Sequence, residues 1–379
     1  MFSYKKTSHL FIQKKLTSDD ATGSFHSALW HVHKNNKPLK ADKNRLWFLK
    51  QNYNHLRSLK DVIAQEFIRL IIPANPKTRF VCESYSTPEP NYIVDPKKIP
   101  GVINYESYYV MSKAVPGFIS LRQFSQAEIV LHIKSGKWHG MGEIILLSFF
   151  LDDNDVRLDN VCVNNEGRIL RIDGDCALDM LEVGYRFSHH LHKEILYFLT
   201  LAPLEKIAAI HAADIQQLPR RSNNERWLLD NKFKRDAEGN ISKEAYLGEQ
   251  LASISVIQTE MDKAILKLLL LPKSLVSRFL KYYVPVEELK LIDKVFDIRL
   301  TTLASAVASR TSFFAYVASE SAKNDMENFI LQLQAFKPYS DYKLLQEVDV
   351  SYIRKKFDVL HELQEFTQPE LASPSRPAL

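Results

Sequence analysis

Glycine is scarce in this sequence, with 11 glycines among 379 residues, less than half of the usual share of about 7%. A fold that depends on several glycine-rich phosphate-binding loops is therefore disfavoured. Cysteine is scarcer still, because Cys82, Cys162 and Cys176 are too few for a disulfide framework and show no C-x-x-C metal-binding spacing. We therefore expect the protein to work in a reducing compartment such as the cytosol.

Long hydrophobic runs are also absent. The two longest, at 144–151 and 264–271, each include a polar residue and are too short to span a bilayer. Residues 1–15 contain lysines but neither an apolar core nor a small-residue cleavage site, so we expect no signal peptide. With 45% hydrophobic and 25% charged residues, the composition excludes a disordered, collagen-like or coiled-coil chain.

Charge is distributed unevenly along the chain. Residues 1–60 hold 12 lysines and arginines against Asp19, Asp20 and Asp42, a net charge of +9, while the whole chain has a net charge of +5. A basic first sixth suits an anionic partner such as a nucleotide, a polyphosphate, an acidic lipid or a nucleic acid. A solvated basic surface would account for the same charges equally well.

The first part of the chain is predicted to be rich in strands. Short apolar runs indicate strands at 10–12, 28–32 and 46–49, and the polar turn at 35–37 predicts a hairpin between the last two. Ser58-x-x-Asp61 resembles a capping box that opens a helix over about 59–72. Two further strands are expected at 78–84 and 107–113, on either side of a proline-rich loop at 86–104.

The rest of the chain is predicted to be mainly helical. Residues 119–150 are expected to form helices, and a hairpin of two short strands is expected at 161–163 and 169–172. Apolar residues then recur at helical spacing at 190–201, 244–270, 274–282, 285–315, 317–336 and 350–366. Residues 367–379 contain three prolines and no periodicity, which indicates a disordered tail.

These elements predict an α+β fold of two lobes with a C-terminal helical extension. We expect the β-rich lobe to cover 1–112, the second lobe 113–255, the helical extension 256–366 and the tail 367–379.

Acids and amides gather between predicted apolar elements near the middle of the chain. They are Asp152, Asp153, Asn154, Asp155, Asp159, Asn160, Asp173 and Asp175. Carboxylates in such a setting need a cation, and their oxygens suit Mg²⁺ or Mn²⁺, which commonly accompany the phosphates of a nucleotide. Asp175 fits a second metal ligand or a turn residue, and Asp153 is expected to be a solvated acid at a helix end.

The spacing within this group is informative. Asp155 and Asn160 are five positions apart, as in the D-x-x-x-x-N of a kinase catalytic loop, and Asp173 follows 13 positions after Asn160 across the predicted hairpin. The pattern resembles the catalytic loop and the metal-binding aspartate of protein kinases. This resemblance implies that Asp155 orients the attacking hydroxyl, while Asn160 and Asp173 hold the metal of the ATP complex.

The same resemblance implies further parts upstream. Lys50 ends a short apolar strand and would hold the α- and β-phosphates of ATP, and Glu66 lies beside the apolar stripe of the next helix, where Lys50 is its natural partner. The strand that runs into residues 113–117 resembles the hinge, which places Ser112 and Ala114 at the nucleotide.

The likeness covers about residues 20–180 and departs from ordinary protein kinases. No G-x-G-x-x-G precedes Lys50, so Gly23, Ser24 and Ser27 are the candidates to cover the phosphates, although they would also suit a polar turn. The His-Arg pair before the catalytic aspartate is replaced, Asp-Phe-Gly becomes Asp-Gly-Asp at 173–175, and no Ala-Pro-Glu follows.

These departures resemble the atypical kinases that intracellular bacterial pathogens secrete as effectors. The tail, with Glu362, Glu365 and Glu370 around Pro369, also resembles a C-terminal type IV secretion signal. The family resemblance implies delivery into a host cytosol, with a protein of the host cell as the favoured acceptor. It also allows activation by a host polyanion such as inositol hexakisphosphate, and docking to a phosphoinositide membrane.

A basic cluster in the polar stretch 219–242 is the candidate polyanion site, although a solvated charged loop would look the same. Its members are Arg220, Arg221, Arg226, Lys232, Lys234 and Arg235. No aromatic platform accompanies these charges, so we expect no nucleic-acid binding. The helices at 274–300 alternate basic and apolar residues, which suits either a membrane surface or helix packing with a wet face.

The remaining candidates have plainer explanations. His189, His190 and His192 have no cysteine close by, so a helix surface accounts for them better than a zinc site, and Cys162 and Cys176 are expected to be small core residues. Two alternatives to an active kinase stay open. One is a pseudokinase whose helical extension binds a membrane or a host protein, and the other is a kinase fold that transfers AMP.

Overall fold

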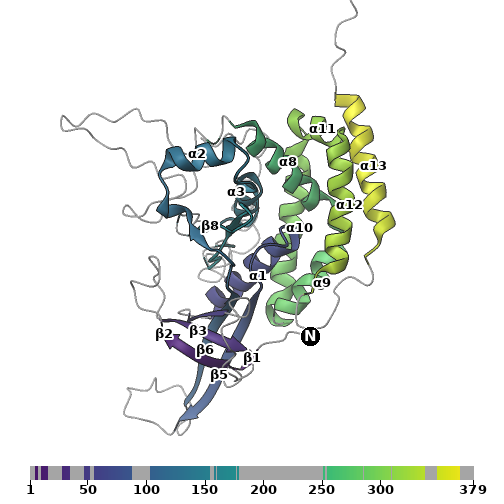
Figure 1. Ribbon diagram of the computed structural model, residues 1–379. Coiled ribbons are helices and arrows are strands. Elements are labelled where there is room, and N and C mark those ends of the chain that lie inside the picture. The colour runs from purple at the N-terminus through teal and green to yellow at the C-terminus, as the bar shows by residue number, and fades with distance from the viewer. Residues whose placement is uncertain are drawn as a thin grey trace, which may run out of the picture.

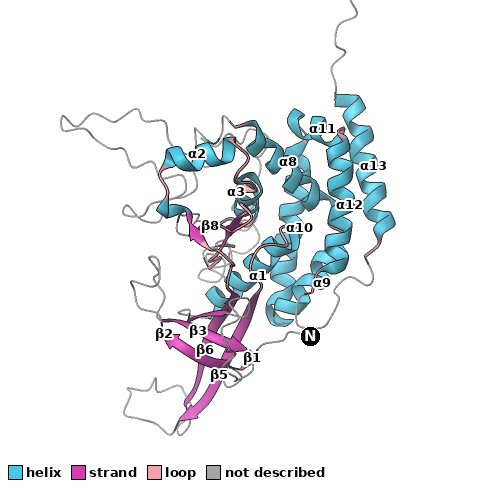
Figure 2. Ribbon diagram, viewed as in Figure 1, coloured by secondary structure: helices cyan, strands magenta, loops and turns pink. Residues whose placement is uncertain are grey.

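The structure is a computed structural model, and the part of the chain that it describes contains two sheets with helices packed beside them (Figure 1 and Figure 2). It describes residues 5–6, 10–15, 28–34, 47–51, 55–87, 103–153, 158, 160–175, 177–178, 251, 254–284, 286–308, 310–337 and 348–367. This part of the chain is a mixed α+β structure, as the sequence predicted.

The larger sheet has six strands in the order β1-β5-β6-β4-β3-β2. The strands are β1 (Lys5–Lys6), β2 (Leu10–Lys15), β3 (Ala28–Lys34), β4 (Trp47–Gln51), β5 (Thr78–Thr87) and β6 (Ile103–Lys113). The predicted pairing of 28–32 with 46–49 is confirmed, because β3 and β4 run antiparallel with Trp30 opposite Leu49. The turn expected at 35–37 lies outside the described residues.

Helix α1 (His55–Ile71) follows β4 and lies between the larger sheet and the C-terminal helices (Figure 1). It is buried along most of its length, and Phe67 contacts the rings of Phe150 and Phe296 with centroids 5.6 and 4.8 Å away. The expected capping box is wrong, because the helix begins at His55 and both Ser58 and Asp61 are buried within it. A capping box joins the residue before a helix to the third residue inside it, whereas Ser58 and Asp61 are the fourth and seventh residues of α1.

A second, three-stranded sheet belongs to the middle of the chain, with β7 (Ile119–Ser120), β8 (Val161–Val163) and β9 (Ile169–Arg171) in that order. The hairpin predicted at 161–172 is confirmed as the antiparallel pair β8–β9. Around this sheet lie the short helix η3 (Leu121–Gln123), α2 (Gln126–Lys134) and α3 (Met141–Phe150). Every residue of α3 is buried, and the helix packs against α8 and β9.

Six helices end the described chain: α8 (Ser255–Leu270), α9 (Lys273–Tyr283), α10 (Val286–Val307), α11 (Thr311–Val317), α12 (Glu320–Ala335) and α13 (Val350–Thr367). We call these six the annex. One continuous helix over 285–315 was expected and is wrong, since α10 ends before Arg310 turns inward. The guanidinium of Arg310 lies 2.6 Å from the carboxylate of Asp262 and 2.9 Å from Gln258, so a buried ion pair interrupts the helix.

The annex is joined to the rest of the molecule through its core. Helix α8 packs along α3, and the buried side chains of α1, α3 and the annex form a single apolar cluster across the boundary expected at 255–256. None of the helices within the described ranges is both long enough and apolar enough to cross a membrane.

Candidate functional site

The candidate site is built around Lys50 on β4. Its backbone is paired with Leu29 of β3 and Val110 of β6, so the strand holds the side chain at the centre of the larger sheet. The ammonium nitrogen lies 2.5 Å from a carboxylate oxygen of Asp61 and 2.6 Å from one of Asp173. Lys50 is only 8% exposed, and at this one buried charge β4 and the helix after it meet a segment that lies 123 positions further along the chain.

A third carboxylate, that of Asp175, lies 3.9 Å from the same ammonium. Burial favours the neutral amine, but the three nearby carboxylates outweigh it and raise the pKa of Lys50 above its ordinary value. Burial and the two neighbouring acids raise the pKa of Asp61, with Lys50 opposing them. Three ionised carboxylates around one ammonium would leave two negative charges in excess, which favours either a further cation or a retained proton.

The acid of α1 that binds Lys50 is Asp61, so the expected Lys50–Glu66 ion pair is wrong. Glu66 accepts hydrogen bonds from the Thr78 amide at 2.6 Å, from the Tyr283 hydroxyl at 2.6 Å and from Arg69 at 2.5 Å. Five residues turn an α-helix by about 140°, so the two acids leave α1 on different sides.

The sequence held a signal for Glu66 but none for Asp61. Glu66 has a local cation at the i+3 position, Arg69, which can satisfy it without help from a distant lysine. Asp61 also has a cation on its own helix face, Arg57 four residues before it, so the local pattern does not indicate that Asp61 takes Lys50 as its partner.

The segment after β9 closes against α1 at a glycine. The Gly174 amide donates to Asp61 at 2.8 Å, and a β-carbon at this position would lie 2.9 Å from that of Ala64. Asp173 has a φ of 65°, a backbone conformation that is rare for residues other than glycine and costs about 1–3 kcal/mol. The contact with α1 therefore holds Asp173 in a strained conformation that directs its carboxylate toward Lys50.

Arg171, at the end of β9, holds this segment in place through a hydrogen bond to its backbone. It is fully buried, donates to the Asp173 carbonyl at 2.8 Å, and forms an ion pair with Asp153. Its backbone amide donates to the side chain of Asn75 at 3.1 Å. The expectation of a solvated Asp153 is therefore wrong, because this acid is buried and joins the end of α3 to the strand before Asp173.

Asn160 lies beside Asp173 across the hairpin. Its carbonyl accepts a hydrogen bond of 2.9 Å from the Ile172 amide, which extends the β8–β9 ladder by one position. The hairpin therefore brings Asn160, Asp173 and Asp175 to one end of the smaller sheet. Asp155, the expected hydroxyl-orienting residue, lies outside the described residues.

The other predicted residues are placed as follows. Ser112 lies on β6 opposite Phe48 of β4, and its hydroxyl is 3.3 Å from that of Thr78. Ala114 follows the end of β6. Cys162 is a buried core residue as expected, and burial raises the pKa of its thiol to about 12. The remaining candidates lie outside the described ranges: Gly23, Ser24, Ser27, Cys176, His189, His190, His192, Arg220, Arg221, Arg226, Lys232, Lys234 and Arg235.

The donor chemistry of Asn160, Asp173 and Asp175 fits Mg²⁺ or Mn²⁺, since all three offer oxygen ligands. Within the described ranges, no three His, Cys, Asp or Glu side chains are grouped to hold a metal by themselves. A metal that travels with a nucleotide does not need such a group, because phosphate oxygens and water complete its coordination.

Neither a protein-family model nor a curated protein sequence matches this chain.

Proposed function

We propose that this protein is an ATP-dependent phosphotransferase with a protein-kinase-like fold, which transfers the γ-phosphoryl group to a hydroxyl acceptor, with a protein favoured. One observation carries the proposal. Lys50 of the larger sheet and Asp173 of the β8–β9 hairpin are 123 positions apart and lie 2.6 Å from each other, with Asn160 across the hairpin from Ile172. A strand lysine, a metal-binding aspartate and a catalytic-loop asparagine are the parts that phosphoryl transfer requires.

The order of the elements supports the same reading. Lys50 lies on the third strand of the antiparallel β2-β3-β4 meander, and the helix that follows, α1, supplies an acid to it. In protein kinases the corresponding lysine lies on the third strand and is held by an acid of the next helix. Here Asp61 takes the place that Glu66 was expected to fill, one and a half turns earlier in the helix.

Each residue then has a chemical task. Lys50 would bind the α- and β-phosphates, and Asp61 would orient Lys50 and hold the Gly174 backbone. Asn160 and Asp173, with Asp175 as a further oxygen donor, would hold Mg²⁺ or Mn²⁺, and the metal would neutralise charge on the phosphate oxygens. Asp155 would orient the acceptor hydroxyl.

The proposal is tested by incubating the full chain with ATP labelled at the γ- or the α-phosphate, with Mg²⁺ or Mn²⁺. Transfer from γ-labelled ATP to a protein acceptor or to the chain itself is expected. Asp173→Ala should abolish it, whereas Asp297→Ala should not, because Asp297 is a half-exposed acid of α10 that pairs with Lys273. Label from neither nucleotide under any condition would refute the proposal, and label from the α-phosphate alone would identify an AMP transferase.

The activator is part of the same proposal. An inositol polyphosphate would bind the basic cluster at 220–235, so adding inositol hexakisphosphate should raise the rate of transfer. Substituting Arg220 and Arg221 with glutamine should remove this stimulation while leaving the basal rate unchanged.

A further inference from the structure

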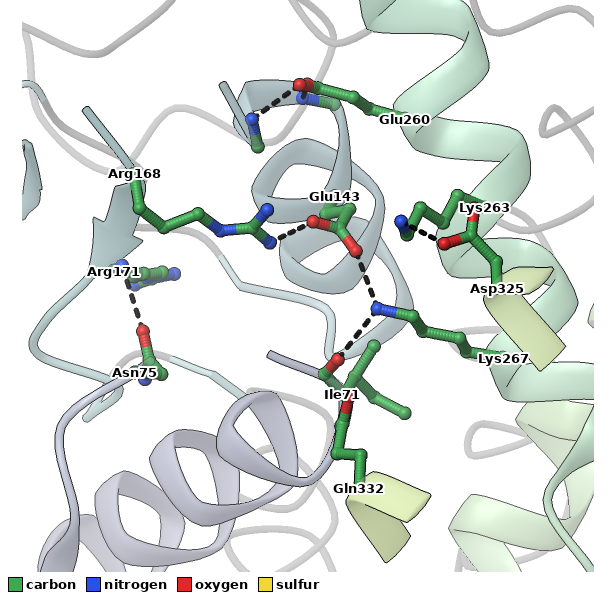
Figure 3. A network of polar contacts seen from close by, with 12 residues as sticks. Ile71, Asn75, Glu143, Arg168, Arg171, Glu260, Lys263, Lys267, Asp325 and Gln332 are labelled. Atoms are coloured by element: carbon green, nitrogen blue, oxygen red, sulfur yellow. Dashed lines mark hydrogen bonds and ion pairs between the residues drawn. The ribbon is translucent and has the colours of Figure 1, made fainter. Parts of the chain in front are cut away.

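The C-terminal end of α1 is held by side chains of the annex. The last carbonyls of an α-helix have no partner within the helix, so another group must bind them. Gln332 of α12 donates to the Leu70 carbonyl, and Lys267 of α8 donates to the Ile71 carbonyl at 3.0 Å (Figure 3). The annex therefore completes the end of a helix that belongs to the first part of the chain.

A second contact joins the annex to the middle of the same helix. Tyr283, the last residue of α9, is fully buried, and its hydroxyl donates to the Glu66 carboxylate at 2.6 Å. Arg69 binds Glu66 from within α1 and donates at 3.0 Å to the carbonyl of Lys337, just beyond α12. Hydrogen bonds to a buried carboxylate are among the stronger ones in proteins, so these contacts define where the helix lies.

The N-terminal half of α1 carries the acid of the site. Asp61 precedes Glu66 by five residues, or about 7.5 Å along the helix axis, and binds both Lys50 and the Gly174 amide. A displacement at Glu66 is transmitted to Asp61, because one continuous helix joins them.

We propose that the annex positions the nucleotide site, with Tyr283 as a positioning residue that acts through Glu66 and α1 on Asp61. The inference rests on the proposed function for its consequence in phosphoryl transfer, and on the described contacts for its geometry. It assigns the annex a regulatory task, since any partner that moves α9 would also move the acid that binds Lys50.

The experiment uses Tyr283→Phe, which removes the hydroxyl and keeps the ring against that of Phe279, which in turn contacts Phe67. Tyr316→Phe is the matched control, because the Tyr316 hydroxyl also donates to a carboxylate at 2.6 Å, that of Asp325 on α12, within the annex. Hydrogen exchange at the Gly174 amide reports whether Asp61 still binds it. We expect Tyr283→Phe to speed this exchange about three- to tenfold, the effect of weakening one hydrogen bond, and Tyr316→Phe to leave it unchanged.

Gln332→Leu provides a second variant, because it removes another contact between the annex and α1, and it should speed exchange at Gly174 in the same way. Equal exchange at Gly174 in wild type, Tyr283→Phe and Gln332→Leu would overturn the inference. So would faster exchange that is uniform over the molecule, because uniform loss of protection reports general destabilisation.

Kinetics separate the two proposals. In an active protein, Tyr283→Phe should lower kcat about three- to tenfold with little change in KM for ATP, as expected for an interaction needed in the transition state. An inactive wild type with faster Gly174 exchange in Tyr283→Phe would refute the proposed function alone. An active wild type in which Tyr283→Phe matches Tyr316→Phe in exchange and in kcat would refute the positioning role alone.

Discussion

Glu143 is the residue whose replacement most directly tests how the annex is joined to the rest of the molecule. It lies on α3 and is 1% exposed, with one carboxylate oxygen 2.9 Å from Lys267 of α8 and the other bound by Arg168 (Figure 3). Lys267 also donates to the Ile71 carbonyl at the end of α1. One buried carboxylate thus links three parts of the chain.

The expected loss of unfolding free energy follows from the burial of the charged groups. Burial would raise the pKa of Glu143, but the two cations outweigh it and lower the pKa, and burial lowers the pKa of Lys267 against the pull of Glu143. In Glu143→Gln the ammonium of Lys267 stays buried without a carboxylate, which costs about 3–5 kcal/mol of unfolding free energy. Lys267→Met removes that ammonium and leaves Glu143 paired with Arg168, so a smaller cost of about 1–3 kcal/mol is expected.

The assay is urea unfolding followed by far-ultraviolet circular dichroism, on the two single variants and on the double variant. The double variant should lose less than the sum of the two by about 2 kcal/mol, because it no longer contains the unpaired ammonium. Lys263→Met is the control, since Lys263 and Asp325 are partly exposed and their pair should contribute less than about 1 kcal/mol. A cost of less than about 1 kcal/mol for Glu143→Gln, or strictly additive costs of the two single substitutions, would refute this prediction.

Three further predictions concern the site and its support. Asp61→Asn should lower γ-phosphoryl transfer about 30- to 100-fold, because Lys50 loses the acid that orients it, and a transfer assay showing wild-type kcat would contradict this role. Gly174→Ala should cost about 1–3 kcal/mol, because its β-carbon would meet that of Ala64 at 2.9 Å, and thermal unfolding with an unchanged Tm would refute the close approach. The lowered pKa of Glu143 stabilises the fold at pH values above its unfolded value of about 4.3, and this contribution is lost as the pH falls through the folded value. Tm measured from neutral to acid pH should therefore fall less steeply in Glu143→Gln than in wild type.

Two S/T-x-x-acid motifs show how far local patterns reach. Ser125-x-x-Glu128 forms a capping box at the start of α2, where both side chains are exposed. Ser58-x-x-Asp61 has the same pattern but lies inside α1, and Asp61 binds Lys50 and Gly174. The motif alone does not distinguish the two, because a capping box forms only where the Ser or Thr immediately precedes a helix, and the motif does not show where the helix begins.

The placement of Lys50, Asn160 and Asp173 on a strand and a hairpin followed from short-range patterns. Short apolar runs bounded by turn residues, at 46–49, 161–163 and 169–172, indicated β4 and the β8–β9 pair, and both are present. The position of Asp173 beside Asn160 was predictable too, because a tight antiparallel hairpin joins residues that are near in sequence.

The partners of buried charges were not predictable in the same way. Glu66 binds Tyr283, which is 217 positions away, and Arg310 binds Asp262 across the annex. Such pairs depend on how helices are rotated and packed against each other, and many acids and bases in the sequence could satisfy the same local rule.

Short-range patterns were thus sufficient for the α+β class, for the strand that carries Lys50 and for the hairpin that carries Asp173, because periodicity and turn residues act within a few positions. The choice of Asp61 over Glu66 as the acid at Lys50, and the attachment of α1 to the annex through Tyr283, arose from contacts between distant segments. The physical reason is that a buried charge must find a partner wherever packing brings one, and packing depends on the whole chain.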